Sequence, residues 1–252
     1  MIYLKKKSEI ALMKESGRIV ARTLRLVSES IVPGKTTPRQ LDALAHRLIL
    51  EEGGIPSFLN YKGYPATACI SVNEVVIHGI PDDRVLQEGD IIDLDFGVIK
   101  EGWHADGAWT YPVGTISADA QRLLNVTRES LYQGIGKARV GKRLGDVGHA
   151  IQKYVENNGY SVVREMVGHG IGRNLHEAPH SVANYGRPNT GEMIRDGMTM
   201  CIEPMVNMGR PEIKILDDGW TAVTVDGKLS AHFEHTIAVT KEGVEILTTE
   251  EG

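Results

Sequence analysis

The pattern of apolar positions along this 252-residue chain alternates between helical and strand-like periods. From Ile10 to Val27, apolar or small residues recur at spacings of three and four, and Pro33-Gly34 ends the run. This spacing predicts a first helix. Thr37-Pro38-Arg39-Gln40 has the pattern of a capping box with proline at the first helical position, so a second helix is expected up to Gly53-Gly54.

The rest of the chain predicts strands and two more helices. Short β-rich stretches at 68–72, 75–77 and 91–99 are separated by clusters of Asn, Gly, Pro and Asp, which is typical of a sheet. The pattern is helical again over 118–138 and 144–157, and it is mostly strand and loop after that. The expected fold therefore has helices, strands, helices and strands in that order.

Similar segments in the two halves of the chain indicate an internal repeat. In both segments a carboxylate follows a glycine by six residues: Asp95 in the first copy and Glu203 in the second. No linker-like tract separates the copies. We therefore expect one domain over 1–252, with halves of about 1–115 and 116–252 around a central site.

Composition narrows the classes of partner. A hydrophobic content of 41% suits a sizeable core, and a net charge of -5 with one basic run, Lys5-Lys6-Lys7, argues against nucleic acid, DNA included. An apolar run of about 18 residues and an N-terminal signal are both lacking, so we expect a cytoplasmic protein without membrane contact. Cys69 and Cys201 are too few for a disulfide framework, and each is expected to be a small buried residue.

Asp95 and Asp106 flank a hairpin signal whose turn is Lys100-Glu101-Gly102. If Ile99 pairs with Gly102, Asp95 lies directly opposite Asp106. Opposed residues share one face with Cβ atoms about 4.5–5.5 Å apart, so a cation is expected between the two charges. A solvated carboxylate or a bulge in the register is the alternative, although burying a carboxylate without a partner costs several kcal/mol.

Three further residues extend this set. His169 lies between two glycines, which let the backbone approach a ligand, while Glu203 and Glu234 each interrupt an apolar or strand-like stretch. An isolated histidine is usually structural, and each acid alone is a weak signal. With the two aspartates, however, they form an oxygen-rich set suited to pairs of Mn, Fe(II), Co or Zn ions. Asp93 is expected at a supporting or edge position.

The segment His176-Glu177-Ala178-Pro179-His180 matches the H-E-x-x-H pattern of zincin proteases. That pattern binds zinc only on a helix, where Pro179 would fall in the interior. We therefore reject the zincin interpretation. Glu177 and His180 are expected in a loop, and His176 remains a candidate to line the same cavity as His169.

In order along nearly the whole chain, these and neighbouring motifs strongly resemble the type I methionine aminopeptidases. The motifs are Cys69 to Pro81, Asp95 to Asp106, His169 to Arg173, Ile202 to Met205, Asp218 to Thr221 and Glu234 to Thr236. The resemblance implies the pita-bread fold, an α+β fold in which two pseudo-symmetric halves share a curved antiparallel sheet flanked by helices. It also implies the minimal bacterial form.

The resemblance also implies which residues hold metal. Asp106 and Glu234 would bridge two divalent ions, Asp95 would bind one, and His169 with Glu203 would bind the other. Water held between the ions would attack the first peptide bond, with Glu203 as proton shuttle. Cobalt, manganese, iron(II) or zinc is expected, with a monovalent cation nearby.

Further roles follow from matching positions in the family. His176 would stabilise the oxyanion, and His78 would lie near the scissile amide nitrogen. The methionine pocket would be formed by Tyr61, Tyr64, Cys69, His78, His176 and Trp220, with Phe58 and Leu175 at its wall.

Four positions depart from the pattern of common bacterial members. Phe58 and Leu175 look exchanged in size, which leaves the shape of the pocket open. Gly97 and Cys201 stand where a threonine often supports the metal site, which leaves the preferred metal open.

The expected activity is removal of the initiator methionine from nascent polypeptides whose second residue is small, by a monomer that contacts the ribosome transiently. Two alternatives remain. An X-prolyl aminopeptidase or prolidase would share the ligands, although such enzymes usually carry an extra N-terminal domain. A metal-free binding protein would share the fold, although such proteins tend to lose ligands that are all present here.

Overall fold

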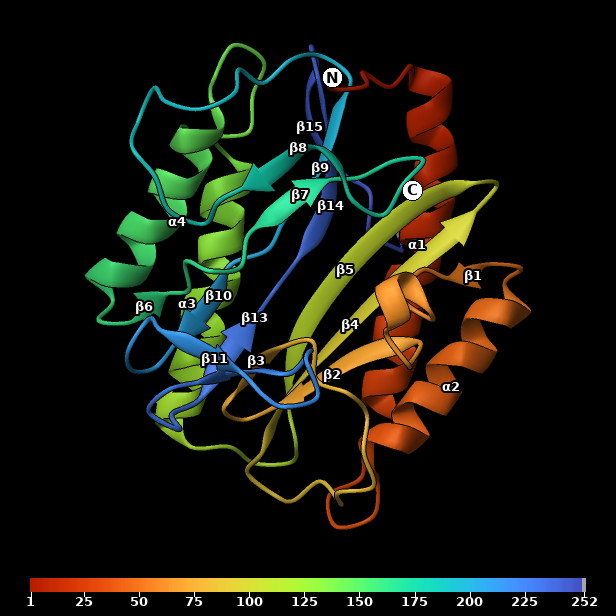
Figure 1. Cartoon of the computed structure of the whole chain (residues 1–252), viewed down its shortest axis with the longest axis vertical. Helices are drawn as coiled ribbons and strands as arrows, with labels where there is room; N and C mark the ends of the chain where they lie inside the picture. The colour runs from red at the N-terminus through yellow and green to blue at the C-terminus, as the bar shows by residue number, and fades with distance from the viewer. Residues whose placement is uncertain (251–252) are drawn as a thin grey trace.

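Two helices open the chain, as the apolar spacing predicts. α1 spans Lys7–Glu29 and α2 spans Pro38–Glu51. The predicted capping box is present, since the Gln40 amide donates to Thr37 Oγ1 at 3.3 Å and the Thr37 amide donates to Gln40 Oε1 at 3.0 Å. This computed structural model describes residues 1–250, and in it both helices lie against the first sheet (Figure 1).

The first sheet is built on a long antiparallel hairpin of β4 and β5, and β2 and β1 also pair with β4. The strands are β1 (Ile55–Pro56), β2 (Ala68–Val72), β4 (Ile91–Lys100) and β5 (Trp103–Pro112). Side chains alternate between the faces of a strand. Ile92 to Val98, at every second position of β4, pack into the core with α1 and α2, so Asp93 and Asp95 face the opposite side.

The turn of the hairpin lies one residue later than expected. Lys100 pairs with Trp103, so the turn residues are Glu101 and Gly102. Their φ angles of 51° and 73° are those of a type I′ turn, which favours glycine at its second position. Gly102 is therefore part of the turn and does not pair with Ile99.

This register places the two aspartates diagonally. Asp95 lies opposite Ala108, and Asp106 lies opposite Gly97. The prediction that the aspartates are directly opposed was therefore wrong. A shift of two residues keeps both side chains on the same face, where diagonal neighbours are about 7–8 Å apart, so the two carboxylates still converge.

The second half repeats this order of elements. α3 (Ala118–Ile135) and α4 (Leu144–Asn157) pack against each other, close to the predicted ranges. The antiparallel sheet that follows has the order β15-β14-β9-β7-β8. Its strands are β7 (Gly168–Gly170), β8 (Glu177–Val182), β9 (Met198–Ile202), β14 (His235–Thr240) and β15 (Gly243–Ile246). Among residues 1–250, no helix is both long and apolar enough to cross a membrane.

Two three-stranded sheets, in the orders β13-β10-β6 and β11-β12-β3, complete the structure. Their strands are β3 (Val75–Ile77), β6 (Ser161–Val162), β10 (Met205–Asn207), β11 (Ile213–Ile215), β12 (Ala222–Thr224) and β13 (Ser230–His232). A 3-10 turn, η1, covers Tyr61–Gly63.

The segment that matched the zincin pattern contributes to a strand. β8 includes Glu177 and His180, so the expectation that these two residues lie in a loop was wrong. Pairing of Glu177 with Gly170 on β7 extends the sheet at this point. Because the segment is extended, its histidines do not share a helix face, which agrees with the rejection of the zincin interpretation.

A seam of hydrogen bonds joins the two halves. The Glu234 amide donates to the Ala108 carbonyl at 2.8 Å. Thr236 Oγ1 donates to the Asp106 carbonyl at 2.7 Å and accepts from the Asp106 amide at 2.9 Å. β4 pairs with β5 as β9 pairs with β14, and the helix pairs lie on opposite outer sides (Figure 1), which confirms the internal repeat. The expected domain limits stay a prediction.

Gly97 and Phe58, noted separately in the sequence, form a single packing arrangement. A Cβ atom on Gly97 would lie 2.6 Å from Cε1 of Phe58 and 2.8 Å from Cβ of Ser57. Real Cβ atoms do not approach other atoms so closely. The Phe58 ring therefore occupies the space that a threonine at position 97 would need.

We predict that Gly97→Thr lowers the free energy of unfolding by about 1–3 kcal/mol through overpacking. Phe58→Ala in the same chain removes the clash with the ring and leaves the one with Ser57 Cβ, so the double variant should be more stable than the sum of the single effects predicts, by about 0.5–3 kcal/mol. Urea unfolding measures all three variants. Gly136→Thr is the control, since a Cβ there meets only carbonyl oxygens at 3.4 Å or beyond. Strictly additive effects would contradict this arrangement.

Candidate metal centre

A cavity of about 290 Å³ brings together residues from both halves of the chain. All thirteen residues predicted for the site line it: Phe58, Tyr61, Tyr64, Cys69, His78, Asp95, Asp106, His169, Leu175, His176, Glu203, Trp220 and Glu234. The sequence did not single out five others that also line it: Lys62, Ile77, Glu165, Met166 and Val167.

Three of the five predicted metal ligands lie within strands, and the other two lie next to the ends of two further strands. Asp95 and Asp106 lie within β4 and β5, and His169 lies at the centre of β7. Glu203 directly follows β9, and Glu234 directly precedes β14. Each is at most 9% exposed, so none of the carboxylates can be hydrated as it would be at the surface.

Each of the four carboxylates has one oxygen that is buried and has no hydrogen-bond partner. These oxygens are Asp95 Oδ1, Asp106 Oδ1, Glu203 Oε1 and Glu234 Oε1. Buried polar atoms in native proteins are nearly always satisfied, and an unpartnered carboxylate oxygen is especially costly. Divalent cations would satisfy all four. The residues present therefore fit a metal centre with oxygen and imidazole ligands.

His169 is oriented as a metal ligand requires. Its Nδ1 donates to the Gly170 carbonyl at 3.0 Å, which fixes the tautomer and leaves Nε2 free. Nε2 lies 3.7 Å from Glu203 Oε1 and 3.9 Å from Asp106 Oδ2. Two ligands of one ion, each about 2.1 Å from it, lie roughly 3–4 Å apart, so these separations suit a shared ion.

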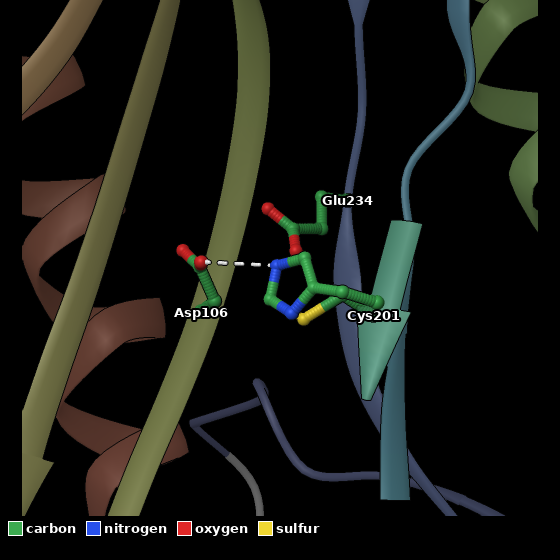
Figure 2. A group of neighbouring side chains, drawn as sticks. Asp106, Cys201 and Glu234 are labelled. Atoms are coloured by element: carbon green, nitrogen blue, oxygen red, sulfur yellow. Dashed lines mark ion pairs between the residues drawn. The ribbon is translucent and has the colours of Figure 1, made fainter. Parts of the chain in front are cut away.

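Cys201 points toward the same group, at the position where the resemblance places a threonine that supports the metal site. Figure 2 shows Asp106, Cys201 and Glu234 converging, and together with His169 each offers a donor atom within 4.8 Å of the others. The Cys201 thiol also lies 3.5 Å from Thr236 Oγ1. Its position two residues before Glu203 on one strand face was the signal for this placement.

Sequence reasoning also missed His232. Its Nδ1 donates to Asp93 Oδ2 at 3.2 Å, and its Nε2 lies 4.0 Å from Glu203 Oε2. Both members of this pair are buried. Asp93 lies between paired strands rather than at an edge, so it supports the site from behind Glu203. The signal was the alternation that puts His232 and Glu234 on one side of an extended segment.

Burial controls the charge of these groups. It raises the pKa of Asp106 from 3.8 to about 7. It raises the pKa values of Asp95, Glu203 and Glu234 well above their usual range, and the nearby Asp106 carboxylate is the next cause. Burial lowers the pKa of His169 to about 4, so its imidazole is neutral near pH 7, as metal binding requires.

The apolar end of the cavity is closed by aromatic rings. Trp220 meets Tyr64 edge-on with ring centroids 5.1 Å apart, and it meets His78 at 6.3 Å. The Tyr64 hydroxyl donates to the Gly79 carbonyl at 2.9 Å, which holds the segment that carries His78. His78 has a φ of 58°, a strained conformation of the kind that is often found at functional sites.

His176 stands between the aromatic wall and the ligand group. Its ring stacks on Tyr61 with centroids 5.3 Å apart and an angle of 17°, and its centroid lies 3.9 Å from that of His169. Burial lowers the pKa of His176 to about 3, with His169 as the next cause. The ring is therefore neutral near pH 7 and offers one N–H donor.

We predict that Mn(II) raises the melting temperature of the metal-free protein by more at pH 8 than at pH 6. The unfolded Asp106 ionises near 3.8 and the folded one near 7, so the metal-free protein loses stability as pH rises between these values. Metal binding needs the ionised carboxylates, so metal affinity increases over the same range. Thermal unfolding after chelation, with and without Mn(II), measures the difference. Equal increments at both pH values would contradict the prediction.

Comparisons with known proteins agree with this site. A model of metallopeptidase family M24 matches residues 11–241. Over 248 residues the chain is 53% identical to methionine aminopeptidase 1 of Bacillus subtilis strain 168. The alignment covers 98% of this chain and 99% of that protein. The crystal structure of methionine aminopeptidase from Thermotoga maritima superposes with a TM-score of 0.96 at 48% identity, covering 99% of this chain and all of that one.

A prolidase from Pyrococcus furiosus has a TM-score of 0.78 at 20% identity and shares the fold alone; the match covers 99% of this chain and 66% of the prolidase. The structural matches confirm the pita-bread fold. The full-length identity and the family match together show that the chain belongs to the methionine aminopeptidases of metallopeptidase family M24.

Proposed function

We propose that the protein hydrolyses the first peptide bond of polypeptides that begin with methionine and have a small second residue. The observation that carries this proposal is the adjacency, in one cavity, of an aromatic pocket and four buried carboxylates with unpartnered oxygens. Such a cavity holds an apolar side chain at one end and performs metal-assisted hydrolysis at the other. The similarity to methionine aminopeptidases over the full chain supports the same substrate.

The ligand assignment is part of the proposal. Asp106 and Glu234 would each help to hold two divalent ions, Asp95 would hold one of them, and His169 with Glu203 would hold the other. When bound, the ions supply a Lewis acid that polarises the scissile carbonyl and acidifies the attacking water. The choice among cobalt, manganese, iron(II) and zinc, and the monovalent cation nearby, stay predictions.

The chain's own residues would carry the protons and orient the substrate. Glu203 accepts a proton from the attacking water and returns it to the leaving amine. The neutral His176 ring, which stacks on the Tyr61 ring, would donate a hydrogen bond to the developing oxyanion. His78 lies against Trp220 at the aromatic end and would face the scissile nitrogen.

The proposed direction of cleavage follows from where the free amine and the first side chain of the substrate would bind. The free amine lies on the Asp95 side of the ligand group, and the methionine side chain enters the aromatic pocket. A thioether packs well against ring edges, so the rings favour methionine. The pocket residues are Phe58, Tyr61, Tyr64, Cys69, His78, Leu175, His176 and Trp220. We further propose that the enzyme is a cytoplasmic monomer that acts on nascent chains during a transient ribosome contact.

We expect the purified enzyme, loaded with Mn(II), Fe(II) or Co(II), to release methionine from Met-Ala-Ser. It should release far less from a peptide with isoleucine in second place, and it should not cleave Xaa-Pro dipeptides. Chromatography of free amino acids measures each rate. Release of no methionine with any metal would sink the proposal, and cleavage of Xaa-Pro peptides would favour the prolidase alternative.

We expect Asp106→Asn to reduce turnover of Met-Ala-Ser by more than about 100-fold, because loss of groups that merely support a ligand already costs 10–100-fold. Titration calorimetry should also show weaker metal binding. Asp83→Asn is the matched control, since Asp83 is exposed and pairs with Arg39 at 2.8 Å. Retained turnover in the Asp106 variant would exclude a bridging role.

A further inference from the structure

One lysine of the basic run is buried rather than solvated. The Lys5 side chain is 0% exposed, and its Nζ contacts Glu177 Oε1, whose side chain is 13% exposed. Lys6 and Lys7, by contrast, are exposed. Burial lowers the pKa of Lys5, and the Glu177 carboxylate opposes that shift. A lysine is almost never buried without a partner, so Glu177 accounts for this placement.

The partner of Lys5 directly follows His176 in the chain. Glu177 opens β8 and pairs with Gly170 of β7, so the segment 171–176 is a loop whose two ends are held together there. His176 is the last residue of this loop, and its ring lies over His169. Any shift of Glu177 is therefore transmitted through one peptide bond to His176.

The Lys5 side chain crosses the base of this loop in close contact. A Cβ atom on Gly172 would lie 2.6 Å from Lys5 Cε and 2.7 Å from Glu177 Oε1. Glycine at position 172 is thus what allows the aliphatic part of Lys5 to pass. The contact is part of the packing of the loop, in addition to the ion pair.

Lys5 is itself anchored on the rest of the second half. Its amide donates to the Gly197 carbonyl at 2.7 Å, at the point where the chain enters β9. A Cβ atom on Gly197 would lie 2.6 Å from the Lys5 carbonyl oxygen, so the two backbones are in direct contact. The backbone of Lys5 is therefore held in place, and its side chain extends from there to the loop.

The far end of the loop has separate supports. The Arg173 guanidinium lies 4.0 Å from the centre of the Trp103 ring and donates to the Gly102 carbonyl at 3.1 Å. The His104 amide donates to the Gly172 carbonyl at 2.8 Å. Of these supports, the ion pair with Lys5 is the one next to His176.

We propose that Lys5 is a positioning residue for His176: the N-terminal segment braces the loop 171–176 through Glu177 and fixes the imidazole against the reacting carbonyl. Lys5 is not among the residues that line the cavity. The proposal rests on the role in oxyanion stabilisation proposed above for His176.

The test compares Lys5→Met and Glu177→Gln with the matched pair Lys7→Met and Glu242→Gln. Lys7 and Glu242 form an exposed ion pair at 3.0 Å, and neither residue lines the cavity. We expect kcat for Met-Ala-Ser to fall roughly 10–100-fold in the Lys5 and Glu177 variants, because small misplacements near the reacting atoms have effects of this size. The calorimetric affinity for Mn(II) should change less than about twofold, since neither variant alters a proposed ligand. KM should change less than kcat, since His176 is one of eight pocket residues.

A second comparison shows whether Lys5 acts through His176. In a His176→Asn background, adding Lys5→Met should reduce kcat no further, whereas an independent role would give the same factor again. Glu177→Gln, which conserves volume, provides the same comparison if Lys5→Met does not fold.

Methionine release by the unmodified enzyme is measured first, so failure of the proposed function appears as an inactive wild type. Wild-type kcat in a folded Lys5 or Glu177 variant overturns the positioning proposal, and so does an undiminished loss in the His176→Asn background. A loss in the Lys7 and Glu242 variants as large as that in the Lys5 pair also overturns it.

Discussion

Mutual repulsion among four carboxylates buried in one cavity is the constraint on which the rest of the structure depends. Charges so close in a low-dielectric interior cannot all be ionised without a cation. Burial, followed by the charge of Asp106, raises the pKa values of Asp95, Glu203 and Glu234 well above their usual range, which is how the metal-free chain responds to that repulsion. The same repulsion favours binding of dications, because a bound dication offsets the unfavourable free energy of the buried negative charges.

Much of the fold follows from local patterns in the sequence. The helix α1, the capping box at Thr37 and the β-rich stretches up to β4 were predicted within three residues of their limits. Each depends on nearby residues alone. The thirteen predicted site residues also line one cavity, because motifs in a fixed order carry long-range information that local patterns lack.

The remaining features depend on tertiary contacts that no local pattern encodes. The hairpin register depends on one glycine. A two-residue turn could be formed by Lys100-Glu101 or by Glu101-Gly102, and only the second places Gly102 in the turn with a positive φ. The Lys5 run looks like an ordinary solvated stretch until Glu177, 172 residues away, is brought beside it. His232 likewise becomes informative only when Asp93, from the other half, lies against it.

The seam between β5 and the segment entering β14 has a consequence for the entropy of the chain. Asp106 and Thr236 are joined there although they are 130 residues apart, and Glu234, two residues before Thr236, is a proposed ligand. An ion shared by Asp106 and Glu234 would close a loop of about that size, as a disulfide does, and would remove conformations mainly from the unfolded ensemble. The proposed metal centre would in this sense be a reversible cross-link between the halves, and its loss would let each half unfold more independently of the other.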